Sequence, residues 1–311
     1  MYHGIINIDK EKGYTSHDVV ARLRGILKQK KIGHTGTLDP DATGVLPVCL
    51  GQGTKLCDML TDHSKQYRAV LLLGKETDTE DISGTVLAEK EVSVGEDEVC
   101  ETIKKFVGEY DQIPPMYSAI KVNGKKLDQL AREGKTIERQ PRHVCITEIV
   151  VEKIELPRVT MMISCSKGTY IRSLCRDIGA ELGCGGCMES LVRTQVGSFF
   201  LKDAIRLDQV EELVKEGRIE KYIVPIENAF LEYPALCVKE ETEKALQNGN
   251  PLRQDGLVGW ETAENREVFL EKMPESTVRV YDRRGYFTGL YEFQKEKGLY
   301  FPKKMFLGNG I

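Results

Sequence analysis

Two carboxylates stand in the middle of a glycine-rich segment, GHTGTLDPDATGVLPVCLGQGTKL, which covers residues 33–56. They are Asp39 and Asp41, and Pro40 lies between them. The proline fixes its own φ and drives the residue before it towards an extended backbone, so Asp39 is carried on a stiff turn. A carboxylate held in this way could be catalytic. It could equally hydrogen-bond its own turn, which is common for an aspartate before proline.

The glycines of this segment also suggest a phosphate-binding loop, but their spacing excludes one. A Walker A loop reads GxxxxGK[ST], whereas Gly53 is followed by threonine and then lysine, with no glycine five positions ahead of it. A dinucleotide fingerprint reads GxGxxG, and the third glycine is missing after Gly51 and Gly53. A carboxylate in a turn remains, and local chemistry does not separate Asp39 sharply from Asp41.

The elements around this segment follow from the spacing of apolar residues. Residues 5–8 predict a short strand, and residues 15–31 predict a helix with an apolar stripe, which threonine or serine at its start can cap. Residues 67–73 predict a strand whose odd positions, beginning with Tyr67, share one face. The polar, acidic residues 75–86 predict a loop.

Two β-rich stretches, residues 144–155 and 159–165, precede an amphipathic helix at residues 169–183. In this helix Arg172 and Arg176 lie four positions apart, so both side chains can project from one side. Strands and isolated helices without regular alternation favour an α+β fold with a largely antiparallel sheet. The other expected elements are a helix at 96–107, a proline-bounded loop leading into a strand and turn at 112–127, a helix around 207–217 and a small β-rich unit from about residue 231.

Composition and charge limit the class of protein. The 311 residues are 41% hydrophobic and carry a net charge of −4, so the chain is not a wholly basic nucleic-acid coat protein. Local basic clusters still allow a basic groove. These clusters are Lys28, Lys30 and Lys31, and Arg139, Arg142 and His143. No signal peptide and no apolar run near the ~20 residues of a membrane span are visible, which predicts a cytoplasmic protein without membrane partners.

Nine cysteines are present, and two of them form the pair Cys184-Gly-Gly-Cys187. Such a half-site can hold zinc, but a structural site needs four ligands, and no second pair is seen. We therefore expect a tight turn with two ordinary thiols and no metal, with a zinc or redox protein as the alternative. The scattered cysteines predict reduced, buried thiols.

With its preceding isoleucine, the glycine-rich segment resembles the signature of the tRNA pseudouridine-55 synthase family, known as TruB. Five other segments resemble further motifs of that family, in the same order, between about residues 5 and 200. They read NIDKEKGYTSHDVV, SKQYRAVLLLGKETDTEDISG, QIPPMYSAIKVNGKKL, SKGTYIRSLCRDIG and LVRTQVGSF. Their joint occurrence is very specific.

The resemblance implies a pseudouridine-synthase catalytic domain over residues 1–230, with a mixed, largely antiparallel sheet and an RNA-binding insertion near residues 75–143. Residues 231–311 are similar in size and position to the small PUA-type RNA-binding domain of bacterial members. The α+β fold class expected from the residues agrees with this implication.

The resemblance also implies that Asp39 is the catalytic aspartate, which attacks the target uridine so that the base is detached, turned and rejoined through C5. Attack on the sugar and attack on the pyrimidine ring both need an ionised carboxylate within reach. Tyr67 matches the tyrosine that stacks on the flipped base and helps remove the C5 proton. Arg172 matches the arginine that pairs with the aspartate. Without the motifs, Tyr67 reads as a strand tyrosine and Arg172 as the partner of a neighbour such as Asp177.

Four further residues are implied to bind substrate. His34 matches the histidine that supports the flipped-out loop nucleotides, and Leu191 matches the apolar residue near the base. Gly36 and Arg193 belong to the same matched motifs. On the residues alone, the histidine would be structural and the leucine simple core.

The sequence departs from the family pattern near the RNA-contacting motifs. A small residue, histidine and leucine are common before the LRRT motif, where this chain has Gly186, Cys187 and Met188. The first arginine of that motif is Val192, and Asp128 replaces the usual tyrosine after GKKL. These changes bear on RNA affinity and loop geometry, and they leave Asp39, Tyr67 and Arg172 in place.

The leading hypothesis is a monomeric synthase that acts alone on the T-arm of tRNA, without a cofactor, a metal or an obligate protein partner. RNA loops suit this chemistry because an unstacked base can be splayed into a pocket at modest cost. The alternatives are a guide-RNA-dependent pseudouridine synthase and an RNA-folding or RNA-binding protein without essential catalysis.

Overall fold

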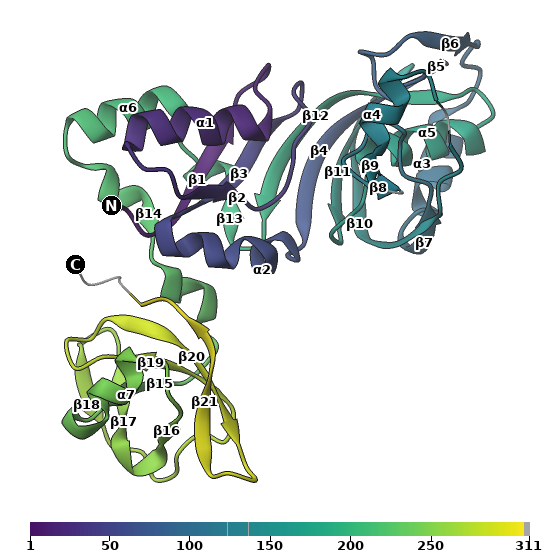
Figure 1. Cartoon of the computed structure of the whole chain (residues 1–311). Helices are drawn as coiled ribbons and strands as arrows, with labels where there is room; N and C mark the ends of the chain where they lie inside the picture. The colour runs from purple at the N-terminus through teal and green to yellow at the C-terminus, as the bar shows by residue number, and fades with distance from the viewer. Residues whose placement is uncertain (123, 136, 308–311) are drawn as a thin grey trace.

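The computed structural model describes residues 1–122, 124–135 and 137–307 and shows two β-rich units joined by a short connection (Figure 1). The larger unit is built on a ten-stranded sheet with the order β14-β1-β3-β12-β4-β11-β10-β7, to which β2 and β13 add at β3 and β12. Its strands are β1 (Gly4–Lys10), β2 (Ile32–His34), β3 (Thr43–Leu50), β4 (Lys65–Leu73), β7 (Gly108–Gln112), β10 (Arg142–Glu155), β11 (Arg158–Cys165), β12 (Gly186–Val196), β13 (Phe199–Phe200) and β14 (Ile223–Val224).

Pairing in this sheet is antiparallel except between β3 and β12, which run in parallel and join the two halves of the sheet. The predicted α+β class with a mixed, largely antiparallel sheet is confirmed. The parallel contact brings Gly44 beside Arg193, and a Cβ on Gly44 would lie 2.3 Å from the Arg193 carbonyl oxygen. The close approach of these two backbones therefore requires glycine at that position.

Six helices belong to the larger unit in the described residues: α1 (Ser16–Leu27), α2 (Cys57–Thr61), α3 (Glu96–Lys104), α4 (Leu127–Arg132), α5 (Ile171–Glu181) and α6 (Leu207–Lys215). A seventh, α7 (Glu243–Gln247), lies in the smaller unit (Figure 1). The α1 helix packs its apolar stripe with α6 onto β1 and β3, while α3 and α5 pack onto the other end of the sheet (Figure 1). Thr15 caps α1 in a reciprocal capping box with Asp18. The helix ends four residues earlier than predicted, because Lys28 adopts a left-handed conformation with φ 49°.

The strand β4 follows the predicted alternation, since Tyr67, Ala69, Leu71 and Leu73 are all buried. The loop predicted at residues 75–86 is wrong in part. Its ends form a two-stranded hairpin of β5 (Lys75–Thr77) and β6 (Val86–Glu89), and only the turn between these strands is irregular. A second short hairpin joins β8 (Lys121–Val122) to β9 (Lys125–Lys126), where a strand and turn were predicted.

The smaller unit is a seven-stranded sheet with the order β16-β21-β20-β19-β15-β17-β18. Its strands are β15 (Ala235–Val238), β16 (Leu252–Arg253), β17 (Leu257–Glu261), β18 (Arg266–Val268), β19 (Thr277–Tyr281), β20 (Phe287–Gln294) and β21 (Leu299–Met305). An apolar cluster joins the two units, in which Phe230, Phe287 and Phe306 pack with Ile5 and Leu56. The domain boundary at residue 230 stays a prediction, as do the RNA-binding insertion and the PUA-like assignment of residues 231–311. No helix in the described ranges is long and apolar enough to cross a membrane.

Candidate active site

The loop that carries Asp39 is held through its main chain. The Leu38 amide donates to Ser16 Oγ at 2.9 Å, and the Pro40 carbonyl accepts from the Gly13 amide at 2.9 Å and from Lys10 Nζ at 3.1 Å. The Lys10 ammonium is buried and also donates to the Tyr14 carbonyl. These contacts fix both neighbours of Asp39 and leave its carboxylate free to face inward.

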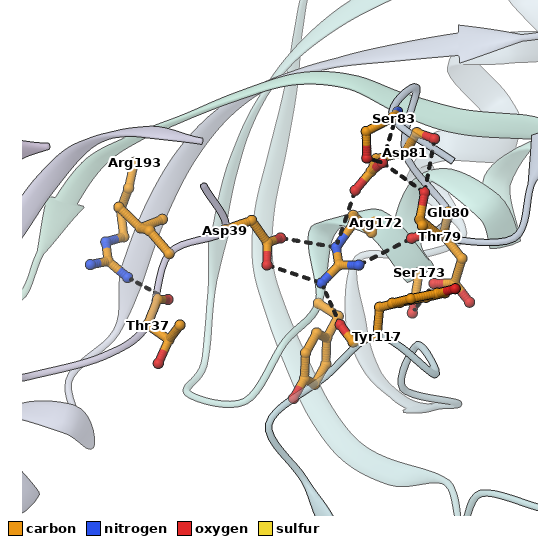
Figure 2. Close-up of polar contacts among 12 residues, drawn as sticks. Thr37, Asp39, Thr79, Glu80, Asp81, Ser83, Tyr117, Arg172, Ser173 and Arg193 are labelled. Atoms are coloured by element: carbon orange, nitrogen blue, oxygen red, sulfur yellow. Dashed lines mark hydrogen bonds and ion pairs between the residues drawn. The ribbon is translucent and has the colours of Figure 1, made fainter. Parts of the chain in front are cut away.

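Arg172 lies in the first turn of α5 and meets the Asp39 carboxylate with two nitrogen atoms (Figure 2). Its Nε is 2.9 Å from Asp39 Oδ2, and its Nη2 donates to Asp39 Oδ1 at 3.1 Å. The guanidinium also donates to the carbonyls of Thr79, at 3.1 Å, and Tyr117, at 2.9 Å, while Asp81 Oδ2 lies 3.9 Å from its Nε. Such a fork of donors sets both the position and the orientation of the carboxylate.

The two aspartates of the turn have different surroundings. The Asp39 side chain is 37% exposed, so it pairs with Arg172 and is still open to a ligand. Asp41 is 63% exposed and its only ion pair in the described chain is a long one with Lys12, at 3.8 Å. Burial raises the pKa of the Asp39 carboxyl above its ordinary value, and the Arg172 guanidinium opposes that rise. Geometry thus separates the two carboxylates, which local sequence chemistry did not.

The alternative pairing of Arg172 with Asp177 is wrong. Asp177 accepts from Arg176, whose Nε is 2.8 Å from its Oδ1. Arg176 also donates to Glu80, so the two arginines of α5 engage different carboxylates. The two arginines lie on one side of the helix, but Arg172 pairs with Asp39 and Arg176 pairs with Asp177 and Glu80.

Tyr67 and Arg193 are directly opposed on β4 and β12, so their side chains lie side by side on one face of the sheet. Tyr67 is 8% exposed and belongs to the apolar cluster that contains Leu38 and Leu191. Burial raises the pKa of its hydroxyl, and the Arg193 guanidinium opposes the rise. The predicted tyrosine and the predicted apolar residue therefore line the same region as the Asp39 loop.

Arg193 is 1% exposed, and its guanidinium is directed to the backbone of the Asp39 loop. Its Nε donates to the Val45 carbonyl at 2.7 Å, and its Nη2 to the Gly36 carbonyl at 3.3 Å. A longer contact of 3.5 Å reaches the Thr37 carbonyl (Figure 2). This arginine holds the loop, and its predicted contact with substrate stays a prediction.

His34 stands at the end of β2, where its ring meets that of His17 edge to face at 5.3 Å. The Gly36 amide donates to His34 Nδ1 at 3.3 Å, and burial lowers the pKa of the ring, which favours neutral imidazole. Gly36 has a φ of 147° and turns the chain towards Asp39. The substrate-binding roles of His34, Gly36 and Leu191 stay predictions.

The sequence did not single out the groups that hold Arg172 or the loop. Lys10, Thr79, Glu80 and Asp81 lay within matched motifs without an assigned role, and Tyr117 supplies only a backbone carbonyl. The acidic run of residues 78–81 could have pointed to partners for the arginines. Its pattern, however, does not distinguish a solvated loop from one whose carboxylates are buried against arginines.

Three of the departures from the family pattern, Gly186, Cys187 and Met188, are buried, whereas Val192 and Asp128 are partly exposed. A Cβ at Gly186 would lie 2.9 Å from the Cys175 carbonyl oxygen, so the chain needs a very small residue there. Cys184 and Cys187 are free, buried thiols on either side of a turn in which Gly185 has a φ of 77°. Among the residues that the structure describes, no three His, Cys, Asp or Glu side chains are grouped to hold a metal ion.

Solved structures share this architecture over almost the whole chain. A Cbf5-Nop10-Gar1 complex matches with a TM-score of 0.69 and 27% identity, covering 98% of this chain and 85% of that one. An H/ACA RNP bound to a substrate RNA containing 2'-deoxyuridine matches with a TM-score of 0.67, at the same identity and coverage. The fold therefore places this chain in the structural class of the Cbf5-type pseudouridine synthases, which are isomerases.

Sequence comparisons define the family within that class. Residues 24–171 match the model for the TruB family pseudouridylate synthase N-terminal domain, and residues 172–231 match the tRNA pseudouridylate synthase B C-terminal domain. A tRNA pseudouridine synthase B of Lachnoclostridium phytofermentans is 55% identical over 98% of this chain and all of that protein. One from Alkaliphilus oremlandii is 48% identical over 82% of this chain and 85% of its own length. The chain belongs to the TruB family of pseudouridine synthases.

Proposed function

We propose that this protein converts uridine 55 in the T-loop of tRNA to pseudouridine, with Asp39 as the attacking group. The observation that carries the proposal is the two-pronged pairing of Arg172 with the Asp39 carboxylate, at 2.9 and 3.1 Å, on a carboxylate that is still partly open to a ligand. The names of the curated relatives supply tRNA as the substrate class.

The reaction needs one bond to break and one to form. The glycosidic bond from C1′ to N1 breaks, the flipped base turns, and C1′ bonds to C5, while C5 loses a proton and N1 gains one. Atoms and electrons balance within the substrate, so no cofactor is required. An ionised Asp39 serves attack on the sugar or on the pyrimidine ring, and Arg172 holds it in the ionised, oriented form.

The other residues of the site divide the remaining tasks. Tyr67 covers a face of the flipped base and helps take the C5 proton, and Leu191 adds apolar surface beside it. His34 and Gly36 support the displaced loop nucleotides, and Arg193 fixes the loop that carries Asp39.

We further propose that the protein acts as a monomer in the cytoplasm on the T-arm, without a guide RNA or a protein partner. Its identity to proteins named tRNA pseudouridine synthase B reaches 55%, against 27% for the solved H/ACA assemblies. The guide-dependent alternative rests on the likeness of fold to those assemblies.

The experiment is turnover of unmodified tRNA by the Asp39→Asn variant. The substitution keeps the shape of the side chain and removes the nucleophile, so pseudouridine formation should be abolished while tRNA affinity persists. Asp41→Asn is the matched control and should keep full turnover. Product from Asp39→Asn, or its loss from Asp41→Asn, would show that the catalytic carboxylate has been assigned wrongly. Tight tRNA binding without turnover by the unmodified protein would favour the RNA-binding alternative.

A further inference from the structure

The turn of residues 79–81 touches α5 with three consecutive residues. The Thr79 carbonyl accepts from Arg172 Nη1 at 3.1 Å, and Asp81 Oδ2 lies 3.9 Å from Arg172 Nε. Between them, Glu80 turns its side chain to other residues of the same helix (Figure 2). The position of two of the groups around Arg172 therefore depends on how firmly this turn is fastened to α5.

Glu80 connects the turn to α5 through both of its carboxylate oxygens. Its Oε2 accepts from Ser173 Oγ at 2.6 Å, and its Oε1 accepts from Arg176 Nη1. The Glu80 side chain is 8% exposed and that of Arg176 is 27% exposed, so the carboxylate end of the ion pair is shielded from water. A buried carboxylate is tolerated only when it is paired and hydrogen-bonded, and Glu80 meets both conditions.

The backbone at Glu80 is unusual for its side chain. Its φ is 65°, in the left-handed region that glycine, asparagine and aspartate adopt more readily than glutamate. The Glu80 carbonyl accepts from the Met188 amide at 3.0 Å, and the Ile82 amide donates to the Met188 carbonyl at 3.0 Å. The main chain thus ties the turn to β12, and only the Glu80 side chain ties this residue to α5.

We propose that Glu80 is a positioning residue for catalysis, which holds the turn of residues 79–81 against α5 and thereby fixes Arg172 on Asp39. The role rests on the proposed function of Asp39. Ser173 directly follows Arg172, and Arg176 lies one helical turn further along α5, so a carboxylate that binds both constrains the first turns of the helix, where Arg172 stands. Small displacements of a positioning group can lower a rate strongly without touching the substrate.

Glu80→Gln is the direct test, because it keeps the volume and the hydrogen bond to Ser173 while removing the charge that faces Arg176. We expect kcat to fall about tenfold or more while the tRNA dissociation constant changes less than about twofold. The pKa of Asp39, followed by NMR in protein with labelled aspartate, should rise. The groups that face Asp39 are Arg172, Asp81 and Lys10, and a loosened Arg172 loses the attraction that lowers this pKa.

Asp177→Asn is the matched control, since Asp177 also pairs with Arg176 but belongs to α5 itself. It should keep the kcat and the Asp39 pKa of the unmodified protein. Glu80→Asn suits the left-handed backbone but lacks the reach to both partners, so it should lose at least as much activity as Glu80→Gln. Full activity in Glu80→Asn would mean that the turn conformation alone suffices, which overturns the proposal.

Two other results also overturn it. One is a proportional loss of tRNA affinity and kcat in Glu80→Gln, which would place Glu80 in RNA binding. The other is an unchanged Asp39 pKa in a folded Glu80→Gln protein. If the unmodified protein itself forms no pseudouridine, the proposed function fails, and the Asp39 pKa still decides the positioning role on its own.

Discussion

The two partners of the Asp39–Arg172 ion pair are held in opposite ways. The main-chain carbonyls of the Asp39 loop accept hydrogen bonds from the buried side chains of Lys10 and Arg193. The Asp39 carboxylate takes no part in these contacts. By contrast, the Arg172 guanidinium is itself held, because it donates hydrogen bonds to the carbonyls of Thr79 and Tyr117. The carboxylate can therefore change without moving its loop, whereas a change at the arginine removes both a charge and an anchor.

The largest effect that tests this asymmetry is expected from Arg172→Met. Loss of the guanidinium should lower kcat by about 10²- to 10³-fold, the size seen when a charge-stabilising donor is removed from an active site. Arg172 also lowers the pKa of Asp39, so without it the carboxyl protonates at higher pH. The acid limb of the pH–rate profile, below which activity falls, should therefore move to higher pH. An equal loss of tRNA affinity and rate would instead place Arg172 on the phosphate backbone.

The hydrogen bonds from Arg193 to the Asp39 loop should contribute to the free energy of unfolding. Arg193→Met leaves buried carbonyls of the loop without their donor, which should lower the free energy of unfolding by about 3 kcal/mol in a urea titration. Arg68→Met is the control, because Arg68 pairs with Glu152 at the surface and such pairs contribute only about 0 to 1 kcal/mol. Equal destabilisation by the two variants would contradict the assigned role of Arg193.

The smallest expected effect is that of salt, which should act on tRNA binding but not on turnover at the site. Phosphate contacts should make tRNA affinity fall at least about tenfold between 50 and 200 mM salt, despite the net charge of −4. The kcat at saturating tRNA should change little, because salt screens exposed charges more than a partly buried pair. Salt-insensitive affinity would count against a basic groove.

Sequence patterns predicted the parts of the fold in which local rules act alone. The alternation from Tyr67 gave the buried face of β4, and the capping residues gave the start of α1. The hairpin at residues 75–89 was missed because its strands are only three and four residues long, and the large apolar residues of β6 are exposed and show no alternation. Neighbouring residues decide the first two features, whereas pairing across the turn decides the third.

The site followed from the resemblance to TruB motifs more than from local chemistry. Asp39 and Asp41 look alike in the chain, and they differ only because a residue 133 positions from Asp39 brings a guanidinium to it. The ties of Glu80 to α5 span 93 and 96 residues, so no local pattern encodes them. Burial of Arg193 was likewise invisible, because an arginine in a strand is usually exposed.

The most direct measurement maps pseudouridine chemically in an unmodified tRNA transcript that has been incubated with the purified protein alone. A catalytic Asp39–Arg172 pair that acts without guide or partner predicts one modified position, in the T-loop, and none with Asp39→Asn. Modification elsewhere, no product until a guide RNA is added, or product with Asp39→Asn would contradict it.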